Sequence, residues 1–101
     1  MPRKKQPQEE TYVLPRVLEI AELDSVYKEL AKFARKTYSK FTLDAGQVAL
    51  IDAAGMQLIV QFLLFMRARD CQVEWINDSI QIYQIAAELG LENQLEDQLE
   101  A

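Results

Sequence analysis

Short apolar runs and longer amphipathic stretches alternate along this chain of 101 residues. The short runs are rich in Val, Ile, Leu and aromatic residues, as strands are, and the longer stretches repeat their apolar residues every three or four positions, as helices do. Strands separated by helices are joined by crossovers, so this order predicts an α/β fold with a mixed, mostly parallel sheet of four to five strands covered by helices. The length fits one domain.

The expected elements follow from this pattern. Strands are predicted at 11–14, 16–19, 41–44, 47–51 and 72–76, and helices at about 21–37, 53–69 and 80–89. In the last strand, the alternation places Val73 and Trp75 on one face and predicts a buried indole. Ser79 stands where a side-chain cap begins a helix, and Gly90 stands where a helix ends. Leu91, Leu95 and Leu99, spaced by four, predict one further helix with a narrow apolar seam.

The two ends of the chain differ from its centre. Residues 1–10 are polar and contain two prolines, so we expect a disordered N-terminal tail followed by a single domain over 11–101. The basic start has no apolar segment behind it, and the most apolar run, Leu58 to Met66, is too short to span a membrane. We therefore expect a cytoplasmic protein without membrane insertion.

Cys71 is the only cysteine, and we expect it to be a small buried apolar residue.

Composition and charge exclude several classes of protein. The formal net charge of −5 argues against direct binding of nucleic acid, which requires Lys and Arg to neutralise phosphates. The chain has no histidine, which excludes Ser-His-Asp triads and histidine-based zinc sites. No glycine-rich phosphate loop or C-x-x-C pair is present. We therefore expect no enzyme, no cofactor and no metal.

Two carboxylates stand out because each ends an apolar strand. Asp44 and Asp52 could act as an acid/base pair if the strand ends were neighbours. The alternative, which we favour, is that Asp44 caps a turn and Asp52 caps the helix after it.

The segment Leu50-Ile51-Asp52-Ala53-Ala54-Gly55-Met56-Gln57-Leu58 holds most of the functional information. Asp52 stands where a helix needs an N-cap, and Gly55 permits close packing in the first turn. The free N–H groups of such a helix start favour an anion, a phosphate or an acidic partner. An ordinary strand-to-helix turn without a ligand is the alternative.

This segment resembles the STAS domain, the fold of bacterial anti-sigma factor antagonists. The similarity lies in the I-D-x-x-G-x-x-L turn at 51–58, in V-x-W-x-N-x-S at 73–79 and in L-G-L at 89–91, and it covers about 14–95. The early pattern, from Leu14-Pro15 to Leu23, is most similar to the branch that includes chemotaxis-associated STAS proteins and the STAS subunit of a lipid-asymmetry transporter. The resemblance implies helices mainly on one side of the sheet and a non-enzymatic protein-binding module.

The resemblance also implies a phosphorylation switch that this chain lacks. In the antagonists, the hydroxyl that a kinase phosphorylates occupies the position of Ala54, and in the lipid-transport branch the key hydroxyl occupies the position of Ala53. Neither alanine can accept a phosphate. The surface would therefore stay in the state of an unphosphorylated antagonist.

The resemblance and the helix pattern together define a candidate docking surface. Gln57 and Gln61 mark one stripe of the second long helix, and the stripe continues into Leu64 and Phe65, which are apolar where solvent is expected. The alternative is that a C-terminal leucine helix covers these two residues. The candidate partner-binding residues are Asp52, Ala53, Ala54, Gly55, Met56, Gln57, Gln61, Leu64 and Phe65.

The partner would be a protein: an anti-sigma factor or related kinase, a chemotaxis component or a transporter component. Three alternatives remain open. The chain could be the STAS subunit that regulates an ABC-type lipid transporter. It could bind a nucleotide or a lipid fragment at the helix start, although no Lys or Arg lies in 51–57. It could also be a homodimer that pairs through an edge strand or through Leu64 and Phe65.

Overall fold

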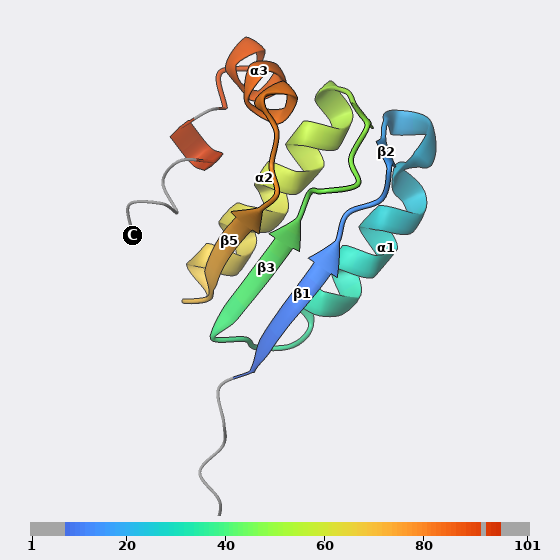
Figure 1. The fold of residues 1–101 in the computed structure, drawn as a ribbon. Helices are drawn as coiled ribbons and strands as arrows, with labels where there is room; N and C mark the ends of the chain where they lie inside the picture. The colour runs from blue at the N-terminus through green and yellow to red at the C-terminus, as the bar shows by residue number, and fades with distance from the viewer. Residues whose placement is uncertain (1–7, 92, 96–101) are drawn as a thin grey trace, which may run out of the picture.

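The computed structural model describes residues 8–91 and 93–95 (Figure 1). Its strands are β1 (Glu9–Val13), β2 (Val17–Leu18), β3 (Lys40–Asp44), β4 (Leu50–Ile51) and β5 (Gln72–Ile76). Its helices are the 3₁₀ turn η1 (Ile20–Glu22) and the α-helices α1 (Leu23–Ala34), α2 (Ala53–Ala68) and α3 (Ile80–Glu88). The alternation of strands and helices predicted from the sequence is confirmed.

The central sheet has three strands in the order β1-β3-β5, and both pairings are parallel. Helices α1 and α2 lie side by side behind this sheet, and no described helix covers its front face (Figure 1). α3 lies beyond the carboxyl end of β5 and packs against α2. On the front face, Lys40 and Glu74 form an ion pair with an N–O distance of 2.6 Å.

The expectation of one sheet with four to five strands is wrong. β2 and β4 pair with each other, also in parallel, as a separate two-stranded sheet. The same two chain segments therefore pair twice: Leu14 N–H donates to the Asp44 carbonyl, and pairing resumes between Val17 and Leu50. Pro15 interrupts the first segment because it has no N–H to donate.

The ends of several elements differ from the predicted ones. β1 begins at Glu9, two residues before the expected start of the domain, because Glu9 and Glu10 continue the pairing with β3. Residues 1–7 of the expected tail lie outside the described residues. The first helix was expected at 21–37, but it begins as the turn η1 and its α-helical part ends at Ala34.

The end of α3 follows the prediction better than its start. Gly90 has a φ of +73°, the left-handed conformation expected after a helix end. Ser79 occupies the N-cap position, but its side chain makes no capping hydrogen bond. The Ser79 main-chain carbonyl instead accepts from Ile82 N–H, one of the groups that a capping side chain would bind.

The core lies between the sheet and the helices α1 and α2. Trp75 is 8% exposed, and Val73 and Cys71 are buried, as predicted. The Phe41 ring is at the centre of an aromatic cluster, with its centroid 5.0 Å from that of Phe33 and 5.2 Å from that of Phe62.

The C-terminal segment adds to the core. Residues 93–95 are helical and Leu95 is fully buried, while Leu99 of the predicted seam lies outside the described residues. No helix in 8–91 or 93–95 has both the length and the apolar character that crossing a membrane requires.

Candidate functional site

The Asp52 carboxylate joins two elements at the start of α2. Its Oδ1 accepts a hydrogen bond of 2.9 Å from Gly55 N–H, which confirms the predicted N-cap. Its Oδ2 accepts one of 3.0 Å from Ile20 N–H, which ties η1 to the same turn. These two bonds hold the pKa of Asp52 below its usual value because they stabilise the anion, and the bond from Gly55 has the larger effect. The Asp52 carboxylate therefore links η1 to the first turn of α2.

Gly55 serves packing inside the turn. A Cβ at this position would lie 2.0 Å from the Leu18 main-chain oxygen, so only glycine lets α2 approach β2 this closely. Gly55 is buried and Met56 is fully buried. Both were among the candidate partner-binding residues, and this assignment is corrected: they shape the turn from inside and offer no surface to a partner.

Asp44 caps a different turn. Its Oδ1 accepts from Gly46 N–H at 2.9 Å and from Asn77 Nδ2 at 3.0 Å. These two donors lower the pKa of Asp44, and the donor of Asn77 has the larger effect. Donors thus stabilise the anions of both Asp44 and Asp52, whereas a general acid needs a raised pKa. The geometry is that of two capping residues.

The remaining candidates lie along one exposed stripe of α2. Ala53 and Ala54 are half-buried at its start, and Gln57 and Gln61 are exposed along it. Leu64 is 45% exposed and Phe65 is 47% exposed, while residues 96–101 of the C-terminal helix that was the alternative cover for them lie outside the described residues. We call the accessible residues of the turn and stripe the α2 stripe: Asp52, Ala53, Ala54, Gln57, Gln61, Leu64 and Phe65.

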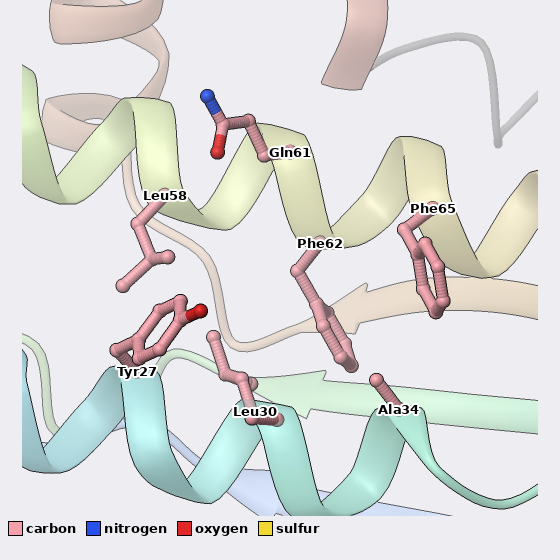
Figure 2. Close-up of a pocket in the computed structure, with 8 residues that line it drawn as sticks. Tyr27, Leu30, Ala34, Leu58, Gln61, Phe62 and Phe65 are labelled. Atoms are coloured by element: carbon pink, nitrogen blue, oxygen red, sulfur yellow. The ribbon is translucent and has the colours of Figure 1, made fainter.

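The structure adds a feature that the sequence analysis missed. A groove of about 360 Å³ runs between α1 and α2, and we call it the α1–α2 groove. Figure 2 shows Tyr27, Leu30 and Ala34 pointing from α1 toward Leu58, Phe62 and Phe65 of α2. Ala31 and Gln61 complete the lining.

The groove has a floor and a rim. Leu30 and Phe62 are buried and form the floor, whereas Tyr27 and Phe65 are exposed. The sequence contained one indication of this groove, since Tyr27 belongs to the apolar side of its helix. The helical period alone does not tell which part of a broad apolar face a sheet covers.

Arg69 joins the carboxyl ends of the two helices, beside the groove. Its guanidinium donates to the Ala34 carbonyl, and it lies over the Phe65 ring, 5.2 Å from the centroid. Arg35 and Lys36 follow Ala34 and Asp70 follows Arg69, so the residues after the two helices carry a net positive charge. An arginine stacked on a ring keeps donors for a carboxylate or a phosphate.

Within the described residues, no group of three or more Cys, Asp or Glu side chains is placed to hold an ion. Comparison with family models, with curated proteins and with solved structures finds no match to this chain.

Proposed function

We propose that this chain is a non-enzymatic regulatory module of the STAS type, which binds a protein partner through the α2 stripe. The observation that carries the proposal is the exposure of Leu64 and Phe65 on the helix that Asp52 caps. Large apolar side chains that remain exposed beside polar residues mark interaction sites in soluble proteins. The resemblance to anti-sigma factor antagonists points to the same turn and helix.

The turn is suited to recognition because it is held in one conformation. Asp52 fixes the first turn of α2 and η1 together, and the close contact of Gly55 with Leu18 fixes α2 on β2. A rigid surface loses little conformational freedom on binding, which favours affinity. Ala53 and Ala54 present only methyl groups there, so the module would bind constitutively, without a phosphate switch.

The partner would be a cytoplasmic signalling or transporter component. The branch of the family that the sequence resembles includes both chemotaxis-associated proteins and a lipid-transport subunit, and the proposal covers both. The proposal therefore specifies the surface that the partner contacts and leaves both kinds of partner open.

Site-specific photo-cross-linking in the host cell tests this proposal. A photoreactive amino acid replaces Gln57 on the stripe or, as a control, Gln84, which is exposed on α3. We expect one protein to cross-link from position 57 and not from position 84. The added substitution Ala54→Glu should abolish that product, because a partner would have to bury an unpaired carboxylate.

The fold should tolerate Ala54→Glu, since a negative charge near a helix N-terminus is favourable. An unchanged melting temperature would establish this. If Ala54→Glu remains folded and the product still forms at the same yield, the α2 stripe is not the binding surface.

A further inference from the structure

We propose that the α1–α2 groove receives an amphipathic helix of the partner protein, with acidic side chains over Arg35 and Arg69. This inference rests on the proposed function and extends it from the α2 stripe to a second wall, supplied by α1. It also assigns a chemistry to the partner segment: apolar side chains for the groove and carboxylates for its arginine end.

The dimensions of the groove suit a helix. The walls run from Tyr27 to Ala34 on α1 and from Leu58 to Phe65 on α2. Seven residues of helix rise about 10 Å, which equals about two turns of a helix lying along the groove. Such a helix presents apolar side chains at i, i+3 or i+4, and i+7 on one face, which is the usual form of helix-in-groove recognition.

The charges around the groove select an acidic segment. α2 contains no Asp or Glu between Ala53 and Ala68. On α1, Asp24 is paired with Lys28 at 3.2 Å. Arg35, Lys36 and Arg69 follow the carboxyl ends of α1 and α2 with one carboxylate, Asp70, so this end has a net positive charge, although the chain as a whole has a net charge of −5. This end therefore attracts carboxylates from a partner, while the rest of the groove is close to neutral.

The direction of the bound helix follows from the helix dipoles. α1 and α2 run in the same direction, because Tyr27 faces Leu58 and Ala34 lies near Phe65 (Figure 2). Their carboxyl ends, which carry partial negative charge, thus meet near Arg69. A partner helix that begins there runs antiparallel to α1 and α2, and the acidic residues of its first turn lie near Arg35 and Arg69.

The test uses the whole protein and a displayed library of helix-forming peptides of about 18 residues, long enough to be helical on their own. We expect the enriched peptides to share an apolar face with spacing of three and four and to carry Asp or Glu near their start. Ala31→Glu and Tyr27→Ala should weaken these peptides about tenfold or more, since one places a charge in the groove and the other removes an exposed wall. Ala87→Glu, on the exposed side of α3, is the matched control and should change affinity by less than about twofold.

A charge exchange tests the arginine end. Arg35→Glu should weaken the acidic peptides several-fold, and peptides whose acidic residues are changed to Lys should recover affinity for this variant. Changing a charge at the rim of an interface alters the affinity and the dependence of that affinity on salt.

Four results would overturn the inference. The enriched peptides could lack the apolar spacing, or they could bind Ala31→Glu and Tyr27→Ala as tightly as the unchanged protein. Light scattering could show a dimer that Ala31→Glu dissociates, which would assign the groove to a second copy of the chain. A fatty acid could raise the melting temperature of the unchanged protein but not of Tyr27→Ala, which would assign the groove to a small ligand.

The partner obtained by cross-linking separates this inference from the proposed function. If Ala54→Glu abolishes its binding and Ala31→Glu does not, the α2 stripe is the binding surface and the groove is not used. If only Ala31→Glu abolishes binding, the groove is used and the Asp52 turn is not. If neither substitution changes binding, both proposals fail.

Discussion

Gly55→Ala tests the contact that holds α2 against β2. The added methyl group would lie 2.0 Å from the Leu18 oxygen and 2.9 Å from the Leu18 carbonyl carbon. Both atoms belong to the main chain, so no side-chain rotation can relieve the clash. The two elements must move apart by at least about 1 Å, and overpacking of this kind costs about 1–3 kcal/mol.

The same movement strains the turn around Asp52. The hydrogen bond from Asp52 N–H to the Leu18 carbonyl joins the displaced elements, and Asp52 Oδ1 in turn accepts the capping bond from Gly55 N–H. Loss of an N-cap costs about 1 kcal/mol. Alanine in place of glycine inside a helix returns about 0.5–1 kcal/mol, so we expect a net loss of about 1–3.5 kcal/mol. This is a large part of the stability of a small domain.

Urea unfolding followed by Trp75 fluorescence measures the loss. Gly90→Ala is the control, because a Cβ there has no neighbour within 4 Å and only the φ of +73° opposes it. That conformation costs about 1–2 kcal/mol, so Gly55→Ala should be the more destabilising of the two. If Gly55→Ala is as stable as the unchanged protein or more stable, the close approach of α2 to β2 is not what this glycine provides.

Three further predictions concern the core and the titrating groups. Trp75→Ala should cost about 3–5 kcal/mol in urea unfolding, because the indole is largely buried, and a native emission spectrum as red-shifted as that of the unfolded chain would contradict this burial. Burial, helped by a hydrogen bond to Glu29, raises the pKa of Tyr12. Its protonated phenol therefore contributes stability that is fully present below about pH 10, the unfolded-state value, and is lost progressively as the pH rises from there toward and through the folded-state pKa. Tyr12→Phe should therefore lose less stability than the unchanged protein between about pH 8 and pH 11 in urea titrations, and equal losses would refute this. The lowered pKa of Asp52 contributes stability above about pH 4 that is lost as the pH falls through the folded-state pKa. Asp52→Asn should therefore be less stable than the unchanged protein at neutral pH, and the two proteins should approach the same stability in acid. A stability difference that persists in acid would contradict this.

Local patterns predicted the individual elements well. The alternation in 72–76 placed Val73 and Trp75 in the core, and the structure places both there. The Asp52 cap and the left-handed Gly90 were also predicted correctly, because a cap and a helix end depend on a few neighbouring residues. Ser79 shows the limit of this argument, since its main-chain carbonyl accepts the hydrogen bond that its side chain was expected to accept.

The exposure of the candidate site residues was predicted in part. The exposure of Leu64 and Phe65 follows from their place beside Gln57 and Gln61 on one helix stripe. The burial of Met56 does not follow from the turn motif, because it depends on where α2 lies against the sheet.

Periodicity, turn residues and charge were sufficient to indicate an α/β chain, its core strand and a capped turn before α2. The long-range arrangement depended on contacts that no local pattern contains. The division into two sheets follows from which strands pair, and the need for glycine at position 55 comes from a carbonyl at Leu18, far away in the chain. The groove arises because α1 and α2 pack side by side on one face of the sheet, which leaves Tyr27 and Phe65 exposed above a shared apolar floor. A residue's spacing determines the face on which it lies, but its neighbours in space determine whether that face is covered.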